Sequence, residues 1–298
     1  MARRGMTTGM IVTLVMMVVV LIIFVLFIIN TTTDIKAKTA RDICKASVRA
    51  NAALRIGTQE FSSKLECFTE ERTIDVRAPE ETKRQLAKAL TDCADQFWQG
   101  KLELFSEDGV FCHICSIISF SDKGKTIDGF KQFLFTTPMS GTTTYAQFLS
   151  GYQSANAGVI GTQQQVFQQD TLDTSKQYAP VFVYIRGRDK IEHYMQKVGG
   201  YTAGTGILLI GVGLIVKGGV TFVVSWWTGA GAVAGAVMTI SGVVVAGVGL
   251  AIDAWTYLFG GAPTEWMAMT QFVQYQPEAL KALGCEMKVP AERKDTFK

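Results

Sequence analysis

The stretch Met10–Ile29, MIVTLVMMVVVLIIFVLFII, contains no charged residue, and Thr13 is its one hydroxyl side chain. At ~1.5 Å per helical residue, a helix of this length extends ~30 Å, the thickness of the hydrocarbon core of a bilayer. A cleaved signal peptide has a shorter apolar region followed by a small-x-small site, whereas this stretch ends in Phe27-Ile28-Ile29-Asn30. We therefore expect an uncleaved transmembrane helix over residues 10–29, preceded by a cytoplasmic N-terminus at residues 1–9.

Residues 202–259 form a second apolar zone, in which Lys217 and Asp253 are the only charged residues. The zone is long enough for two membrane spans and a tight turn. Trp226 and Trp227 lie near its middle, and tryptophan favours the membrane–water interface. The alternative is a Gly- and Ala-rich helical hairpin buried in a soluble domain, but the length and apolar character of the zone favour the membrane.

This zone predicts a Gly-rich transmembrane helical hairpin, with helices over residues 202–227 and 232–259 and a turn at residues 228–231. Small residues recur at a spacing of four, which lets helices approach closely in lipid. The four residues at this spacing are Gly231, Gly235, Gly242 and Ala246. We expect them to pack the helices against each other or to drive self-association.

Lys217 would then be an intramembrane charge, well inside the first of the two helices. A buried ammonium there costs at least ~2.5 kcal/mol on insertion scales. Asp253 lies near the opposite end of the hairpin and would not face it. Lys217 is therefore expected either to serve a function or to extend its ammonium toward the interface.

The orientation follows from Arg3 and Arg4, because basic residues before a first span favour the cytoplasmic side. Residues 30–200 would then form the main, extracytoplasmic domain. The hairpin would return the chain to the same side, leaving residues 260–298 as an extracytoplasmic helical tail. The predicted protein is a multi-pass protein of the cell membrane.

The extracytoplasmic segment has the pattern of an α+β domain with a stalk helix. The expected elements are a stalk helix over residues 35–54, a helix from Pro79 to about Phe97, and strands at residues 110–121 and 177–187. Pro180 lies inside the last strand and indicates an edge strand or a bulge.

All six cysteines fall on the outer side in this topology; they are Cys44, Cys67, Cys93, Cys112, Cys115 and Cys285. An even number on one side predicts disulfides in an oxidising compartment, and six cysteines allow 15 pairings. Cys112 and Cys115 form a C-x-x-C motif, which could also bind zinc or exchange thiols. Zinc needs a second ligand pair, which is absent, and the apolar surroundings indicate a strand, so structural disulfides are favoured over a redox site.

The segments Cys93 to Leu102 and Phe111 to Ser116 resemble a family of uncharacterised, membrane-anchored, cysteine-containing envelope proteins from small-genome archaea. Cys44-Lys45-Ala46-Ser47-Val48 is similar as well, and the resemblance extends over about residues 1–155. It implies an archaeal envelope setting. The family has no assigned activity, so the resemblance implies no chemistry.

Composition excludes several functional classes. The net charge is +3, from 29 basic and 26 acidic residues, which does not suit a nucleic-acid-binding protein. Two histidines leave little room for a His-built metal site. The chain lacks nucleotide-binding loops, the Gly-x-Ser-x-Gly elbow and His-Glu-x-x-His. We therefore predict no catalytic residue, no metal and no cofactor.

The favoured function is a non-enzymatic envelope protein whose disulfide-stabilised ectodomain binds a partner or scaffolds a membrane complex. Its expected partners are membrane lipid and either a second copy of the chain or another envelope protein, without nucleic acid. The alternatives are an oligomeric pore built on the Gly-rich hairpin, an extracytoplasmic thiol–disulfide oxidoreductase and a pilin-like subunit. The last rests on Arg3-Arg4-Gly5-Met6-Thr7, which resembles a prepilin processing site.

Overall fold

The chain has a mixed α+β fold, which confirms the predicted class. The computed structural model describes residues 8–53, 65–105, 107–149, 171–191, 193–194, 209–217, 220–228, 235–240, 243–247 and 264–285. The helices are α1 (Thr8–Ala53), α2 (Pro79–Gln96), the short 3-10 turn η1 (Trp98–Gly100), α3 (Phe130–Thr136), α4 (Tyr145–Leu149) and α7 (Pro277–Ala282). The strands are β1 (Glu70–Ile74), β2 (Gly109–Ile114), β3 (Ser116–Phe120), β4 (Thr126–Asp128), β5 (Pro138–Ser140), β6 (Thr143–Thr144), β7 (Thr171–Asp173), β8 (Tyr178–Arg186), β9 (Leu209–Lys217), β10 (Val220–Thr228), β11 (Gly235–Ile240), β12 (Val243–Gly247) and β13 (Thr264–Gln274).

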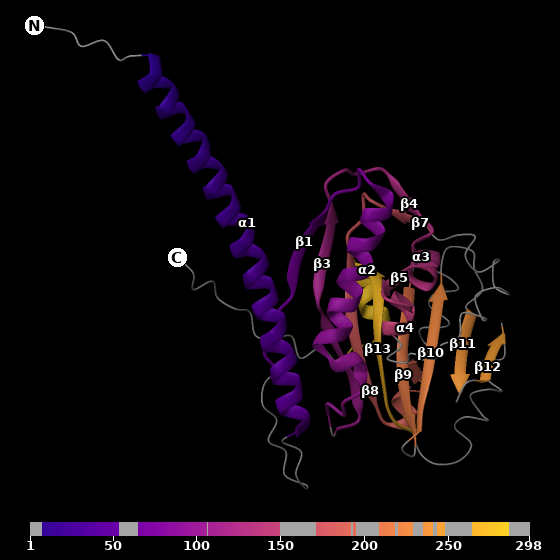
Figure 1. Cartoon of the computed structure of the whole chain (residues 1–298). Helices are drawn as coiled ribbons and strands as arrows, with labels where there is room; N and C mark the ends of the chain where they lie inside the picture. Colours follow the sequence, from indigo (N-terminus) through magenta and orange to yellow (C-terminus); the bar gives the residue numbers. More distant parts are fainter. Residues whose placement is uncertain are drawn as a thin grey trace, which may run out of the picture.

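Nine of the described strands form one sheet in the order β1-β3-β8-β13-β9-β10-β11-β12, with β2 also paired to β8 (Figure 1). The β1–β3 pair is parallel and the other pairs are antiparallel. Strand β13 follows all the other strands in the sequence but lies between β8 and β9. The sheet is therefore continuous only once β13 has been inserted between them.

Strand β8 lies at the centre of the well-packed part of the sheet, and all but the last of its residues are buried. Alternate residues face opposite sides, as the pleat requires. Ala179, Val181 and Val183 belong to one apolar cluster, whereas Phe182 and Tyr184 belong to another. A strand covered on both faces appears as an almost continuous apolar run in the sequence.

Pro180 lies inside this central strand, opposite an irregularity in the neighbouring segment that joins β2 to β3. The β2 pairing ends at Ile114↔Val181, and the β3 pairing is at Ile118↔Tyr178, so the register shifts by one residue between them. The carbonyl of Pro180 accepts a hydrogen bond from the backbone N–H of Cys115. Because proline has no N–H to donate, this interruption of the ladder is where it can be placed. The bulge predicted from Pro180 is confirmed, and the edge-strand alternative is wrong.

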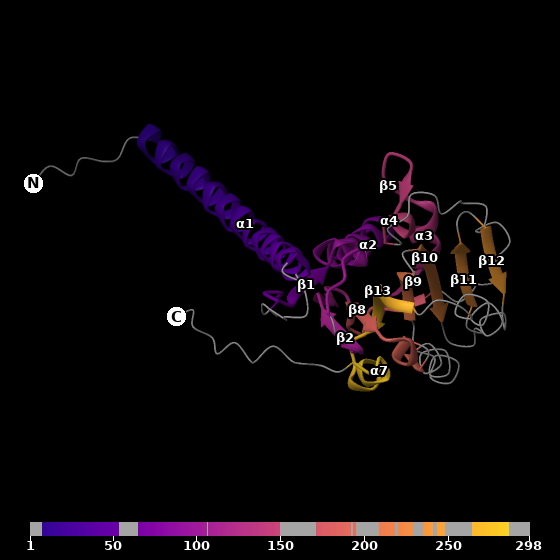
Figure 2. The ribbon, with the colours of Figure 1, turned by 90° about the horizontal axis from the view of Figure 1, so that it is seen from below.

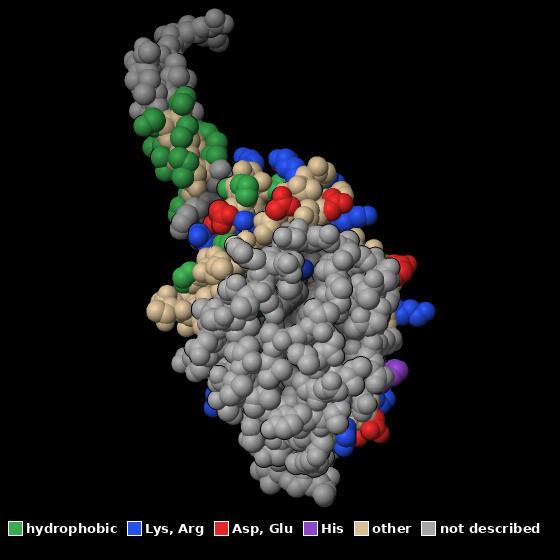
Figure 3. All heavy atoms as spheres, turned by 90° about the vertical axis from the view of Figure 1, so that its right-hand side faces the viewer, with side chains coloured by type: hydrophobic (Ala, Val, Ile, Leu, Met, Phe, Trp, Pro, Cys, Tyr) green, Lys and Arg blue, Asp and Glu red, His purple; other side chains and the backbone are tan. Residues whose placement is uncertain are grey.

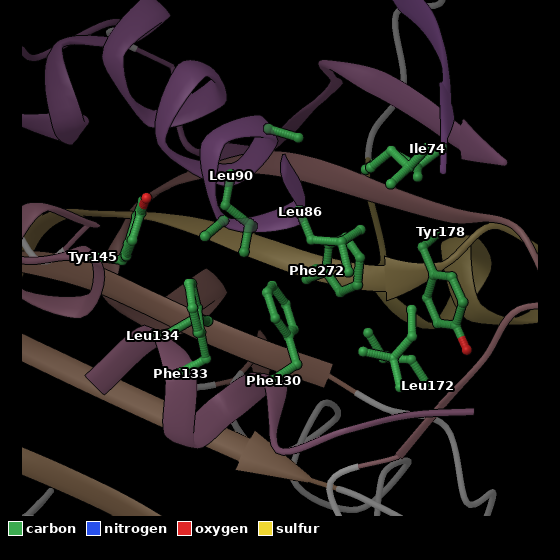
Figure 4. Close-up of a cluster of buried hydrophobic side chains, with 14 of the residues drawn as sticks. Ile74, Leu86, Leu90, Phe130, Phe133, Leu134, Tyr145, Leu172, Tyr178 and Phe272 are labelled. Carbon is green, nitrogen blue, oxygen red and sulfur yellow. The ribbon is translucent and has the colours of Figure 1, made fainter. Parts of the chain in front are cut away.

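Helices cover both faces of the sheet. Leu86 and Leu90 of α2 pack with Phe130 of α3 and with Phe272 of β13 in one cluster (Figure 4). The ring of Phe272 also stacks on Tyr178 at 5.3 Å between centroids. On the opposite face, α7 closes a second cluster around β8 and β13 (Figure 2).

Helix α1 is continuous over 46 residues, which corresponds to a length of ~69 Å. Its N-terminal part projects away from the sheet, and its C-terminal part lies against the domain (Figure 1). Among the helical residues whose side chains the structure describes, which in α1 are 15–25 and 38–53, no segment is long and apolar enough to span a bilayer.

The expected helical hairpin at residues 202–259 is wrong, because the described part of this zone consists of strands β9 to β12. An apolar run does not by itself distinguish a helix from a buried strand, and this zone is rich in glycine and valine, both poor helix formers. Lys217 pairs with Val220 across Gly218-Gly219, a dipeptide typical of tight hairpins. The predicted turn at residues 228–231 lies almost wholly outside the described residues.

The helical tail predicted for residues 260–298 is also wrong in its first half. Residues Thr264–Gln274 form β13, an inner strand of the sheet, and the short α7 is the helix that follows it within the residues described up to 285. Met267 and Phe272 in this strand are completely buried. The segment is therefore part of the core.

The packing of η1 on the sheet predicts a steric requirement for glycine at position 100. Gly100 has φ +71°, and a Cβ there would lie 2.4 Å from the Cβ of Ala268. We expect Gly100→Ala to lower the free energy of unfolding by about 3 kcal/mol, from the left-handed backbone and the clash together. Urea unfolding of the full chain measures this change.

The matched control is Gly124→Ala, because Gly124 has φ +78° but no atom within 4 Å of the added Cβ. It should cost about 1 kcal/mol, the backbone contribution alone. Equal losses at the two positions would show that η1 does not pack against Ala268.

Candidate functional site at the junction of α1 and α2

The last turns of α1 are built into the domain. Cys44, Val48 and Asn51 recur at helical spacing on one face of α1, and each is at most 7% exposed. Cys44 and Val48 pack in a cluster that also includes Cys93 and Phe97 of the segment around α2. Helix α1 therefore contributes to the core at its C-terminal end.

Three disulfides join this core together, which confirms the prediction that the cysteines are bridged. The pairs are Cys44–Cys67, Cys93–Cys115 and Cys112–Cys285. The first joins α1 to the chain before β1, the second joins α2 to the sheet, and the third joins β2 to the segment after α7. In the chain-entropy model, the first two stabilise by about 3 kcal/mol each and the third, which closes the longest loop, by about 5 kcal/mol.

Cys112 and Cys115 are therefore not bonded to each other. They lie three residues apart along an extended segment, and each has a partner in a different element. Cys112 packs with the cluster on the α7 face and Cys115 with the cluster on the α2 face. This arrangement does not support the thiol-exchange reading of the C-x-x-C motif.

A row of ion pairs connects α1 to α2. The guanidinium of Arg41 lies 3.0 Å from Asp92, and the ammonium of Lys45 lies 2.7 Å from Asp95. Arg41 and Asp92 are partly buried, at 23% and 19% side-chain exposure, so their pair is screened less than a surface pair. These contacts fix the rotation of α1 about its axis relative to α2.

Asp92 is the centre of this network. Its carboxylate accepts hydrogen bonds from Arg41, Arg72 and Lys88. Arg72 also donates to Glu70 at 2.7 Å. Burial alone would lower the pKa of Arg72, but the hydrogen bond to Glu70 and the charges of Glu70 and Asp92 together raise it.

Between the two helices lies a cleft of about 260 Å³. It is lined by Lys38, Arg41, Asp42 and Lys45 of α1 and by Lys88, Asp92, Asp95 and Gln96 of α2. Four cations and three carboxylates line it, so its charge is +1. Every residue that lines the cleft is charged or polar, so the cleft suits a small charged group or a polar surface of a partner.

Trp98 closes the C-terminal end of this junction. Its ring lies 5.0 Å from the ammonium of Lys45 and 5.4 Å from the guanidinium carbon of Arg49, and its indole N–H donates to the carbonyl of Lys45. Trp98 and Gln99 have φ +52° and +56°, a left-handed conformation that costs about 1 kcal/mol or more at each residue. The contacts with α1 and the packing of Gly100 compensate for this strain.

His113 is a partly buried histidine at the base of the junction. Burial lowers its pKa to about 4, although a hydrogen bond with the backbone of Phe68 acts in the opposite direction. Its ring lies 5.5 Å from that of Phe97, and its Nε2 has no partner among the described residues. The residue therefore serves the packing of the core.

The structure does not bring together the small residues expected to pack transmembrane helices. Gly235 is the first residue of β11 and Ala246 lies in β12, while Gly231 and Gly242 lie outside the described residues. Lys217 is the last residue of β9, where it pairs in register with Thr264 of β13. The helical arrangement on which a pore was predicted is therefore not formed.

Sequence reasoning missed the junction of α1 and α2. Arg41 and Asp92 are 51 residues apart, so no local pattern pairs them. The available signal was a charged stripe at helical spacing on each predicted helix. In the described parts of the chain, no three His, Cys, Asp or Glu side chains are grouped to hold a metal ion.

No family model matches this chain, and no curated protein or solved structure is significantly similar to it. The resemblance to archaeal envelope proteins therefore stays a prediction. Function has to be inferred from the geometry alone.

The network predicts a large difference between two neighbouring carboxylates of α2. Asp92→Asn leaves two partly buried arginines, Arg41 and Arg72, and the exposed Lys88 without their shared carboxylate, and it should lower the free energy of unfolding by about 2–3 kcal/mol. Asp95→Asn removes a single ion pair, that with Lys45, and Asp95 is 47% exposed. This change should lower the free energy of unfolding by less than about 1 kcal/mol. Urea unfolding of both variants tests this, and equal costs would contradict the central place of Asp92.

His113 predicts an acid-sensitive stability. Because the pKa is about 4 in the folded state and 6.5 in the reference state, the unfolded chain binds the extra proton. The stability that comes from keeping His113 neutral in the folded state is fully present above pH 6.5. As the pH falls toward 4, the free energy of unfolding decreases by about 3 kcal/mol in total.

The check compares urea unfolding of the parent and of His113→Gln between pH 7 and pH 4. Asp75 and Asp173 also have lowered pKa values, through hydrogen bonds with Arg77 and Ser175, but they are present in both proteins and cancel in the difference. The parent should lose more stability than the variant across this range. Parallel pH profiles would show that His113 is not buried in its neutral form.

Proposed function

We propose that this chain is a membrane-anchored, non-enzymatic protein, with α1 as its anchor and its disulfide-bridged domain on the oxidising side of the membrane. The observation that carries the proposal is the exposure of α1. Residues Val15 to Val25 form three turns of helix, and every large apolar side chain among them is between 43% and 69% exposed (Figure 3).

Successive residues of a helix point in directions about 100° apart, so these turns present apolar side chains on every side. A helix that is apolar all around is stable when apolar material surrounds it, either a protein core or lipid. No described part of the chain covers it. The uncharged run continues from Met10 to Ile29, a length that matches the hydrocarbon core, which favours lipid as its surroundings.

The disulfides support the proposal that the domain lies on the oxidising side of the membrane. Bridges form and persist in oxidising compartments, and all six cysteines are bridged. Cys44 lies only 15 residues beyond Ile29 on the same helix, so the bridged domain begins close to the end of the apolar run. Arg3 and Arg4 before the run favour a cytoplasmic N-terminus and agree with this orientation.

In this proposal the domain binds or positions another component at the membrane surface. The rigid attachment of α1 to α2 sets how far from the membrane the domain is held and how it is oriented. The charged cleft at this junction is the described surface that suits a partner, and the described residues do not form a metal-binding group.

The anchor is tested by placing charges in it. Val18→Asp combined with Ile22→Asp should cost about 5–7 kcal/mol of insertion free energy and release the chain from membranes under alkaline carbonate extraction. Ala46→Asp is the control, because Ala46 is exposed on the same helix beside the domain and should leave the chain in the membrane pellet.

The side of the membrane is tested in the same cells with a membrane-impermeant maleimide. Label should appear on Cys112 and Cys285, the least buried bridge, only after treatment with an impermeant reductant. Extraction of the parent chain by carbonate, or labelling that requires permeabilised cells, would refute the proposed anchor or its orientation respectively.

A further inference from the structure

The two helices that line the cleft carry matched rows of charged residues. Lys38, Arg41 and Lys45 lie on one face of α1, and Lys88, Asp92 and Asp95 lie on one face of α2. The helices run side by side in the same direction (Figure 1). Two of the facing pairs are opposite in charge, because Lys45 pairs with Asp95 and Arg41 pairs with Asp92.

The facing positions nearest the N-terminal end of α1 are different, because both are cations, Lys38 and Lys88, and both line the same cleft. Lys88 is 62% exposed and contacts Asp92, a carboxylate that it shares with two arginines. Lys38 is exposed and has no ion pair with any residue that the structure describes. The third carboxylate of the cleft, Asp42, does not reverse its charge of +1.

A neutral polar group lies at the other end of the cleft. Gln96 is 5% exposed, and its amide oxygen has no partner among the described residues. A buried amide without a partner costs about 1–3 kcal/mol, so a ligand that supplies a hydrogen bond there gains that amount back. Either end of the amide can face the cleft, because oxygen and nitrogen exchange by a flip of the group.

We propose that this cleft binds a phosphate ester that carries hydroxyl groups, with the phosphate between Lys38 and Lys88 and a hydroxyl at the amide of Gln96. Ammonium groups bind phosphate as point charges, and no metal or covalent step is involved. The glycerophosphate head group of an anionic lipid has this chemistry, and so does a free sugar or glycerol phosphate.

The position of the site allows a lipid as the source, and this part of the inference rests on the proposed anchor. Lys38 lies nine residues beyond Ile29, ~14 Å along the helix. The head-group layer extends ~5–8 Å beyond the hydrocarbon core, and a lysine side chain can extend toward it. A head group of the outer leaflet is therefore within reach of the basic end of the cleft.

The test is lysine footprinting of the full chain with an amine-reactive ester, read by mass spectrometry. One arm uses nanodiscs of phosphatidylcholine with and without phosphatidylglycerol. The other uses the chain in neutral detergent with glycerol phosphate against chloride at equal ionic strength. At a ligand concentration of twice the Kd, labelling of Lys38 and Lys88 should fall about threefold, while the exposed Lys123 should not change.

Two substitutions in the cleft give effects of opposite sign. Lys38→Gln should weaken the binding of glycerol phosphate about fivefold, and Asp42→Asn should strengthen this binding by a similar factor. Each substitution changes the charge of the cleft by one unit, in opposite directions. Lys123→Gln is the control and should leave the Kd unchanged. Weaker binding of glycerol phosphate to Asp42→Asn, or unchanged binding to Lys38→Gln, would overturn the proposal.

Protection by phosphatidylglycerol supports the site with a lipid as its source. Protection by glycerol phosphate alone supports the site with a soluble phosphate as its source. The absence of protection in both arms overturns the site, even when the chain remains in the nanodiscs and the proposed anchor holds. A chain that does not enter nanodiscs contradicts the anchor, whereas the detergent arm still decides the site.

Discussion

The docking of the last turns of α1 onto the domain is the interaction on which the rest of the arrangement depends. Cys44 and Val48 are buried at this contact, and the bridge to Cys67 makes it covalent. The same helix continues without a break into the exposed apolar turns from Val15 to Val25. A force or a tilt applied to those turns is therefore transmitted directly to the core.

The charges at the junction make this contact specific in its geometry. Apolar packing alone would tolerate some rotation of α1, but a pair as close as Arg41 and Asp92 does not, because a partly buried charge without its partner is costly. The strained turn at Trp98 adds a second constraint, because its ring lies beside two cations of α1. Gly100 then connects the same turn to β13.

The sequence predicted the local elements of the domain well. Helix α2 begins at Pro79 as expected, since proline and acidic residues favour a helix start, and β8 was recognisable from its almost continuous run of apolar, β-branched and aromatic residues. The strand expected at residues 110–121 is two strands separated at Cys115. The disulfides followed from the number of cysteines, but their pairing depends on long-range topology and could not be derived.

The largest error concerned the zone from residue 202 onward. Continuous apolar character is shared by transmembrane helices and by inner strands, so composition favoured the wrong element there. The inner position of β13 was equally hidden, because its neighbours β8 and β9 precede it by many residues. The junction of α1 and α2 was missed for the same reason, since the contact of Arg41 with Asp92 exists only in the folded chain.

The most direct test of this account is the disulfide pattern of the chain isolated from membranes, mapped by tryptic digestion without reduction. Cys112 and Cys115 fall in one tryptic peptide, residues 102–123. The structure predicts that this peptide is joined to both residues 89–101 and residues 282–288, and that Cys44 and Cys67 join a separate pair of peptides. Peptide 102–123 recovered alone with an internal bridge, or with free thiols, would contradict the arrangement of α2 and α7 on the sheet, and Cys44 and Cys67 recovered in peptides that are not joined to each other would contradict the docked α1.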